Sequence, residues 1–322
     1  MSIERTMMQK NAFVFPGQGS QRVGMGLDLA DEWPELLDTH YRVADEILGF
    51  PLSTYCWEGP AADLRYMPIT QPAVLLTSLV SLQVLKRNGF QPDVVAGHSL
   101  GEFTALVCAG VLEWTDALRL VRLRGELMAG VNDRVSGTMV AVVGLALPEI
   151  EDLCDKAAAD SAQVVEIANY NDPRQVVVSG QTDAVARLME LVSDAGAERV
   201  VTLEIGGPAH SSLMGQIVDE FAAALAEVRF DDPLVPVYSG DTADRVLTGQ
   251  AARDCLRRQL TGRVRWTDVV ARMADAGVTR FVEVGPGRVL SKLCGRIRPE
   301  VPTSRTNDVV SLRRTLAERH EA

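Results

Sequence analysis

Short apolar runs recur along the chain, and each is followed by glycine or another small residue. Four of them predict buried strands: AFVF at 12–15, DVVAG at 93–97, PVYSG at 236–240 and RFVEVG at 280–285. An apolar segment at 72–87, long enough for a helix, separates the first two. Because parallel strands are joined by such helical crossovers, the pattern predicts an α/β fold with a mainly parallel sheet covered by helices.

Residues 136–205 show a different order of strand-like and helix-like patterns. The segments are, in chain order, GTMVAVVGL, LPEIEDLCDKAAAD, VVEIANYN, QVVVSG, TDAVARLMELVSDAG and RVVTLEI. Their strand-helix-strand-strand-helix-strand order predicts a ferredoxin-like unit. We therefore expect a small domain at 136–205, inserted into a large, discontinuous domain formed by residues 1–135 and 206–322.

The stretch from Met67 to Leu85 contains no charged residue and approaches the length of a membrane span. Its two prolines and its Thr, Ser and Gln residues favour instead a buried helix, which we expect to begin near Pro72. The N-terminal segment has no apolar run long enough for the core of a signal peptide. We therefore predict a cytoplasmic protein without membrane contact.

The charge balance and the cysteines exclude several classes of protein. A net charge of −11 argues against nucleic-acid binding, which requires a basic face, so an anionic partner must meet a local positive patch. The five cysteines form neither a CxxC pair nor a Cys/His cluster. They predict reduced thiols and no bound metal or cofactor.

The strand DVVAG runs directly into Gly97-His98-Ser99-Leu100-Gly101 and then into a helix-like pattern. By itself G-x-S-x-G is compatible with a simple glycine-rich turn. Between a strand and a helix, however, it predicts a nucleophile elbow, in which a tight turn exposes the Ser99 side chain at the helix N-terminus. There the Leu100 backbone N–H and the helix dipole are able to stabilise an oxyanion.

A nucleophilic serine requires a base, and the chain has only four histidines. His98 is expected to point away from its neighbour within the turn, while His40 and His320 lie in polar segments without a nearby motif. His210, in EIGGPAHSSLM, follows a predicted strand and is the remaining candidate, with a purely structural role as the alternative. No carboxylate motif accompanies it, so a backbone carbonyl is expected to orient its ring.

The glycine-rich loop FPGQGSQ follows the first predicted strand. It resembles a phosphate cradle but lacks the lysine of a P-loop. A backbone N–H of Gln18 in this loop is a candidate second donor to an oxyanion, and a plain structural turn is the alternative.

Taken together, these residues resemble the malonyl-CoA:acyl carrier protein transacylases and the acyltransferase domains of polyketide synthases. The motifs FVFPGQGSQRVGMG, AGHSLGEFTAL, LVRLRGELM, AHSSLM and FVEVGPGRVLSKL occur in the family's order and spacing over almost the whole chain. Each motif is only modestly specific, but the combination is highly specific.

The resemblance implies a role for each matching residue. Ser99 is the nucleophile, His210 its base, and Gln18 and Leu100 the oxyanion donors. Arg124 binds the free carboxylate of malonyl, a task that suits a planar guanidinium, although by itself this arginine would pass for a surface residue of a helix. Three further matches are implied: the main-chain carbonyl of Gln259 orients the histidine, and Asn169 and Asn171 line the cleft.

The chain departs from the family pattern at three places. Arg263 stands where a proline is usual, Ser239-Gly240 replaces a common Ser-Asn pair, and Ala209 precedes the histidine where many malonyl-selective polyketide domains have Phe. These differences leave malonyl and bulkier malonyl derivatives open as the acyl group.

The predicted function is ping-pong transfer of malonyl from coenzyme A, through Ser99, to the phosphopantetheine thiol of an acyl carrier protein, in fatty-acid or polyketide synthesis. The alternatives are a hydrolase that clears acyl groups from carrier proteins and an inactive docking module. Arg124 argues against a hydrolase of neutral acyl chains, and the retained serine and histidine argue against the module. Coenzyme A is then a substrate, and we expect a monomer.

Basic residues are concentrated near the C-terminus. Between Arg253 and Arg298 the chain has eleven basic and four acidic residues, against a total charge of −11. Both predicted substrates are anionic, so we expect Arg288, Lys292, Arg296 and Arg298 to form part of a docking entrance. The alternative is that these side chains merely solvate helix faces.

Overall fold

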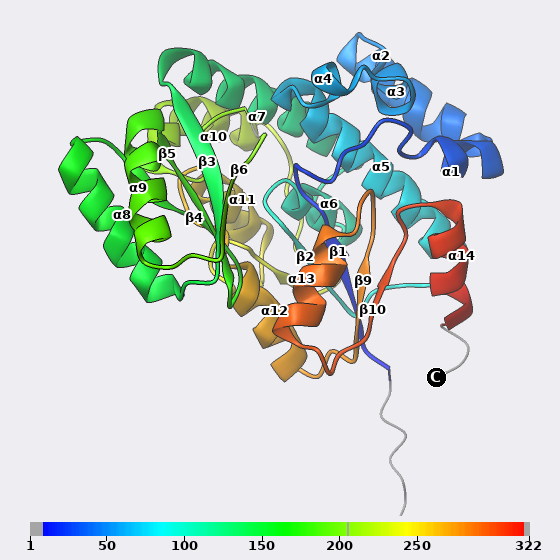
Figure 1. Ribbon diagram of the computed structural model, residues 1–322. Coiled ribbons are helices and arrows are strands. Elements are labelled where there is room, and N and C mark those ends of the chain that lie inside the picture. The colour runs from blue at the N-terminus through cyan, green and yellow to red at the C-terminus, as the bar shows by residue number, and fades with distance from the viewer. Residues whose placement is uncertain (1–8, 205, 319–322) are drawn as a thin grey trace, which may run out of the picture.

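The computed structural model describes residues 9–204 and 206–318, which form two sheets with helices packed around them (Figure 1). The larger sheet has the strand order β10-β9-β1-β2-β7-β8, and each neighbouring pair is parallel except β7 and β8. Its strands are β1 (Asn11–Phe15), β2 (Val94–Gly97), β7 (Val237–Tyr238), β8 (Arg245–Val246), β9 (Arg280–Glu283) and β10 (Thr303–Arg305). The predicted α/β fold with a mainly parallel sheet is confirmed.

Helices cover both faces of this sheet. They are α1 (Leu27–Glu32), η1 (Leu37–Tyr41), α2 (Arg42–Leu48), α3 (Leu52–Trp57), α4 (Ala61–Leu64), α5 (Met67–Arg87), α6 (Gly101–Cys108), α7 (Trp114–Arg134), η2 (Ser212–Ile217), α10 (Val218–Ala226), α11 (Gly249–Arg258), α12 (Trp266–Asp275), α13 (Val289–Ile297) and α14 (Val309–Ala317). Phe13 and Phe15 of β1 belong to the core that includes α5, α6 and α7, whereas Ala12 and Val14 face the core beneath α12 and α13. Because side chains alternate along a strand, β1 is buried on both faces, which explains its unbroken apolar sequence.

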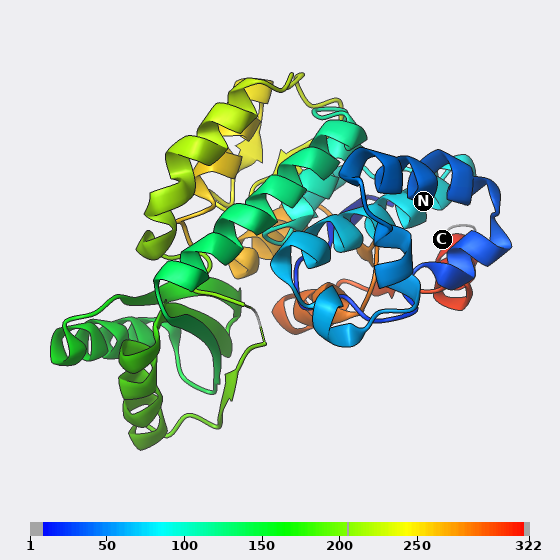
Figure 2. The same ribbon diagram turned by 90° about the horizontal axis from the view of Figure 1, so that it is seen from above.

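The smaller sheet is antiparallel, with the order β4-β5-β3-β6. Its elements are β3 (Gly137–Val143), α8 (Leu147–Ser161), β4 (Val165–Asp172), β5 (Gln175–Gln181), α9 (Thr182–Asp194) and β6 (Arg199–Thr202). They follow the predicted order, and Figure 2 shows this green unit set to one side of the remaining helices. The division into domains at 136 and 205 stays a prediction, although all six elements lie between these bounds.

The helix expected near Pro72 begins earlier, at Met67, so Pro72 lies inside α5. Proline has no N–H to donate to the carbonyl four residues before it, here that of Pro68. The guanidinium of Arg122 donates to that carbonyl instead, at 2.8 Å, so the carbonyl does not lack a hydrogen-bond donor. Although α5 is long and apolar enough to span a membrane, most of it is buried inside the protein, as in a soluble core helix.

Candidate active site

The turn between β2 and α6 places Ser99 at the carboxyl edge of the large sheet. Ser99 has a φ of 52°, a conformation that L-residues rarely adopt. A Cβ on Gly97 would lie 2.0 Å from the Gly101 carbonyl carbon, and a Cβ on Gly101 would lie 2.0 Å from the Phe15 oxygen. Both glycines are therefore required by the close approach of β1, β2 and α6, and the predicted elbow is present.

The structure brings His210 to Ser99. The Ser99 Oγ lies 2.7 Å from His210 Nε2, while His210 Nδ1 lies 2.8 Å from the Gln259 carbonyl oxygen and 3.2 Å from that of Gly262. Because a carbonyl oxygen only accepts, Nδ1 carries the ring hydrogen and Nε2 is free to accept the Ser99 hydroxyl hydrogen. Backbone carbonyls thus orient the ring, and in the part of the chain that the structure describes no carboxylate contacts it.

The environment keeps His210 uncharged. Burial, reinforced by the positive charge of Arg124, lowers the pKa of His210 to about 3. The imidazole is therefore neutral at any pH near 7, which is the form that can take a proton from a serine.

Arg124 of α7 is buried, in contrast to an ordinary arginine on a helix surface. It is 2% exposed, and its Nη2 donates to the Ser99 Oγ at 3.3 Å and to the Gln259 Oε1 at 3.2 Å. Its Nη1 donates to the Oε1 of Gln71 at 2.8 Å, and its Nε has no partner among the described residues. Burial lowers the pKa of Arg124 to about 10, so it stays charged at neutral pH. A positive charge with a spare donor thus stands beside the serine hydroxyl.

Two backbone N–H groups near Ser99 are free. Within residues 9–204 and 206–318, neither the Gln18 nor the Leu100 N–H has a protein acceptor. Leu100 stands at the N-terminus of α6, and Gln18 lines the same cavity as Ser99. The Leu100 N–H, at a helix N-terminus, suits an anionic oxygen, and the Gln18 N–H in the loop after β1 is a candidate second donor.

The two predicted asparagines and the other histidines differ in how they are related to the cavity at Ser99. Asn169 lines the cavity, whereas Asn171 binds the Nε2 of His98 through its Oδ1 at 2.8 Å. His98 turns toward Asn171 and packs edge-to-face on Trp266, with ring centroids 5.5 Å apart. His40 stacks on Trp114, away from Ser99. The fourth histidine, His320, lies outside the described residues.

The cavity at Ser99 measures about 50 Å³. Its lining comprises Gln18, His98, Ser99, Arg124, Met128, Met139, Asn169, Ala209 and His210. The two methionines were not predicted, because an apolar residue on a helix or strand is indistinguishable in sequence from any other core residue. Small Ala209 and the flexible methionines make the apolar wall adaptable.

Three polar side chains near the site were not assigned a role from the sequence: those of Gln71, Gln259 and Glu102. Gln71 and the Gln259 side chain both bind Arg124, and Glu102 is buried behind Gln259. In the sequence, Gln71 could have been noticed as a polar residue within an apolar helix. Glu102 could have been noticed as a carboxylate directly after the last glycine of the elbow.

The predicted docking residues differ in their surroundings. Arg288 and Lys292, at the start of α13, are exposed and have no ion pair among the described residues. Arg296 pairs with Asp172 at 2.7 Å, and Arg298 pairs with Asp275 at 2.6 Å. Only the first two therefore present unneutralised charge to a partner.

The described residues contain no group of three or more His, Cys, Asp or Glu side chains that could hold a metal ion. All five cysteines are buried and free, and burial raises the thiol pKa of Cys56, Cys108, Cys154, Cys255 and Cys294. Such thiols are unreactive, so Ser99 is the nucleophile candidate at this site.

A serine beside a neutral histidine, unpaired N–H donors and a buried arginine can form an ester with an acyl group that carries an acid. On this fold, these features define a serine acyltransferase. In agreement, residues 12–310 match the acyl transferase domain family. The chain belongs to the malonyl-CoA:acyl carrier protein transacylases within that family, as the following relatives show, and the predicted resemblance is confirmed.

Curated relatives and solved structures both carry this name. The malonyl CoA-acyl carrier protein transacylase of Haemophilus influenzae is 41% identical over 306 residues, covering 94% of this chain and 97% of that protein. The Escherichia coli K12 enzyme of the same name is 41% identical over 302 residues, with the same coverage.

Solved structures agree over the whole fold. An acyl carrier protein S-malonyltransferase from Vibrio cholerae superposes with a TM-score of 0.91 and 42% identity, covering 95% of this chain and all of that one. A malonyl-transacylase in complex with its type II polyketide synthase acyl carrier protein gives a TM-score of 0.93 and 38% identity, covering 96% and 100%.

Proposed function

We propose that this chain transfers malonyl from coenzyme A to the phosphopantetheine thiol of an acyl carrier protein through an ester on Ser99. The observation that carries the proposal is the convergence of three side chains: the Ser99 Oγ lies within hydrogen-bond distance of both His210 Nε2 and Arg124 Nη2. The names of the relatives support malonyl as the acyl group and a carrier protein as the acceptor.

In the first half-reaction, the Ser99 hydroxyl gives its proton to His210 Nε2 as its oxygen attacks the thioester carbonyl. The negative oxygen that results is stabilised by the N–H groups of Gln18 and Leu100. When the carbon–sulfur bond breaks, His210 returns the proton to the sulfur of coenzyme A. The malonyl-serine ester then remains.

The second half-reaction runs the same steps in reverse order. His210 takes the proton of the carrier-protein thiol, the sulfur attacks the serine ester, and the proton returns to the Ser99 oxygen as the ester breaks. These steps need no cofactor, because side chains and backbone donors supply every proton and charge.

The five buried thiols agree with a reducing, cytoplasmic location.

Arg124 is proposed to bind the malonyl carboxylate, which lies one methylene beyond the ester carbonyl. Its Nη2 already faces the Ser99 Oγ, and its unpartnered Nε offers a second donor for a two-point contact. This charge favours transfer of malonyl over the alternative, hydrolysis of neutral acyl chains from carrier proteins. One experiment decides between the two: intact-protein mass spectrometry after malonyl-CoA, first alone and then with carrier protein. A transferase retains the ester until the carrier protein is added, whereas a hydrolase loses it to water.

The low pKa of His210 leads to a prediction about pH. An ordinary histidine, with a pKa near 6.5, would be mostly protonated at pH 5, and acylation would fall more than about tenfold between pH 7 and pH 5. Since the pKa of His210 is lowered to about 3, its base form persists throughout this range. We expect acylation by acetyl-CoA, whose acyl group is neutral, to change by no more than about twofold, as measured by quenched-flow mass spectrometry. A fall centred near pH 6.5 would contradict this assignment.

A second prediction concerns docking. Arg288 and Lys292 are exposed and unpaired within the described chain, so the double variant Arg288→Glu/Lys292→Glu should raise the KM for carrier protein several-fold and flatten its salt dependence. Lys156→Glu/Arg245→Glu is the matched control, because it changes the charge equally at two exposed positions that also lack ion pairs among the described residues. Slow hydrolysis of the malonyl-enzyme by water should be unchanged in both variants. Equal KM values for the two double variants would show that Arg288 and Lys292 are solvated surface residues without a role in docking.

A further inference from the structure

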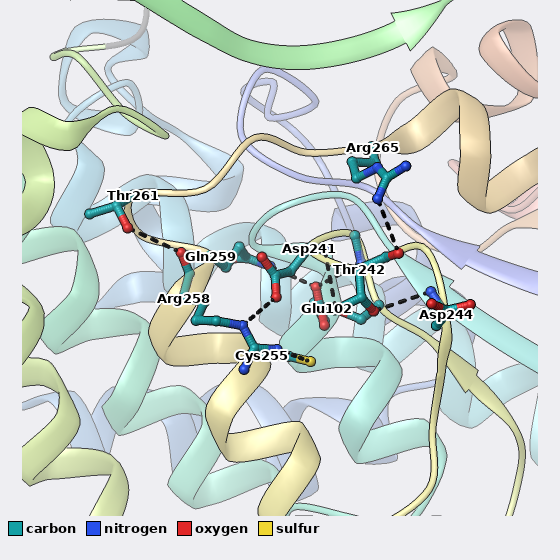
Figure 3. A network of polar contacts seen from close by, with 11 residues as sticks. Glu102, Asp241, Thr242, Asp244, Cys255, Arg258, Gln259, Thr261 and Arg265 are labelled. Carbon is teal, nitrogen blue, oxygen red and sulfur yellow. Dashed lines mark hydrogen bonds and ion pairs between the residues drawn. The ribbon is translucent and has the colours of Figure 1, made fainter.

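Glu102 is a wholly buried carboxylate that the proposed mechanism does not use. It is the second residue of α6, and its side chain lies between α6, α11 and the loop that follows β7 (Figure 3). Its Oε2 accepts from Gln259 Nε2 at 2.7 Å and from the Gly240 N–H at 3.2 Å, while its Oε1 has no partner among the described residues. A buried carboxylate is costly, and burial raises the pKa of Glu102 to about 7.

Gln259, the partner of Glu102, contacts each of the three central site residues. Its main-chain oxygen accepts from His210 Nδ1 at 2.8 Å. Its side-chain Oε1 accepts from Arg124 Nη2 at 3.2 Å, and its Nε2 also donates to the Ser99 carbonyl at 3.2 Å. The orientation of this one amide therefore affects the guanidinium directly.

The two ends of the Gln259 amide meet groups of opposite hydrogen-bonding character. The Arg124 guanidinium only donates, whereas an ionised Glu102 and the Ser99 carbonyl only accept, so the amide can satisfy them in one orientation alone. Of the two acceptors, Glu102 makes the shorter bond, at 2.7 Å against 3.2 Å. We propose that Glu102 is a positioning residue that fixes the Gln259 amide and thereby holds Arg124 in place for the malonyl carboxylate. The proposal rests on the function proposed above and adds the residue that sets its acyl selectivity.

Electrostatics act in the same direction. Arg124 is buried, and the negative charge of Glu102 partly offsets the burial that lowers the pKa of the guanidinium. The neighbouring Asp241 cannot take this role, because it forms an ion pair with Arg258 at 2.8 Å. A purely structural role would instead rest on the bond from the Gly240 N–H to Glu102.

Glu102→Gln tests the proposal, since the substituted amide has the same shape but can present either an oxygen or an NH₂ group to Gln259. The measurement is the ratio of the acylation rates with malonyl-CoA and acetyl-CoA at pH 8. We expect this ratio to fall about tenfold, the scale of a lost hydrogen bond to a charged group, while acetyl acylation stays within about threefold of the parent. Loss of a structural contact would lower both rates together and leave the ratio unchanged.

Glu283→Gln is the matched control. Glu283 is also a fully buried carboxylate that accepts two backbone N–H groups, from Leu290 at 3.0 Å and Ser291 at 2.8 Å, and it makes no contact with Ser99, His210 or Arg124. We expect this variant to lose stability without any change in the malonyl-to-acetyl ratio.

A double-mutant cycle keeps the test decisive if one variant folds poorly. Gln259→Met retains the main-chain carbonyl that binds His210 but removes the amide, so it should lower the ratio by a similar factor. Adding Glu102→Gln should then lower it no further, because Glu102 acts through this amide. Additive losses, or an unchanged ratio in Glu102→Gln, overturn the proposal. If the parent enzyme forms no malonyl ester at all, the proposed function fails instead.

Discussion

Replacing Ser99 with alanine is expected to abolish the covalent malonyl-enzyme and to reduce malonyl transfer by at least about 10⁴-fold. The hydroxyl is the atom that would carry the acyl group, and His210 and the backbone donors have nothing to act on without it. The five cysteines offer no substitute nucleophile, since none lines the cavity and all are buried with raised thiol pKa values. Intact-protein mass spectrometry with malonyl-CoA and no carrier protein measures the adduct directly.

Ser179→Ala is the control for this experiment. Ser179 is a buried serine of β5 whose hydroxyl has no partner in the described structure and which does not line the cavity, so its loss removes an equivalent group without touching the reacting atoms. This variant should form the adduct as the parent does. An adduct that persists in Ser99→Ala, or that maps to another residue by peptide analysis, would refute the mechanism.

Arg124→Ala should weaken malonyl transfer by at least tens-fold and spare or improve acetyl transfer. Removal of one partner of a buried charge pair costs about 2 to 5 kcal/mol, and only malonyl brings the carboxylate that forms this pair. Acetyl has no carboxylate to pair with Arg124, so it loses nothing comparable. The measurement is the acylation rate with each acyl-CoA under single-turnover conditions.

Arg122→Ala is the matched control on the same helix. Arg122 donates to the Pro68 carbonyl and pairs with Glu126 rather than lining the cavity, so its loss should affect stability and leave acyl preference unchanged. Equal losses of malonyl and acetyl transfer in Arg124→Ala would show that this arginine is structural.

The sequence was sufficient to predict those structural features that depend on residues close together in the chain. The elbow could be predicted because its glycines, its serine and the flanking strand and helix are contiguous, and the steric conflict at Gly97 lies within that short turn. The conflict at Gly101, in contrast, is with Phe15 of β1 and exists only in the folded structure. Apolar patterns within single segments predicted the element order of the smaller sheet and four of the six strands of the larger one. Strands β8 and β10 were not predicted, because they are only two and three residues long and mostly exposed, so they have no apolar run. The start of α5 could not be predicted in this way, because Arg122, which compensates for Pro72, belongs to another helix.

The composition of the site depended on tertiary structure. Ser99 and His210 are 111 residues apart in the chain, and Gln259 Nε2 reaches the Ser99 carbonyl across 160 residues. Likewise, Arg124 is hydrogen-bonded to a residue of another helix, and Arg296 and Arg298 form ion pairs with carboxylates from other segments. Residue type and spacing therefore determined which groups could react. Burial and hydrogen-bond partners, which exist only after distant segments pack together, decided that His210 is neutral, that Arg124 faces the serine and that Glu102 stands behind Gln259.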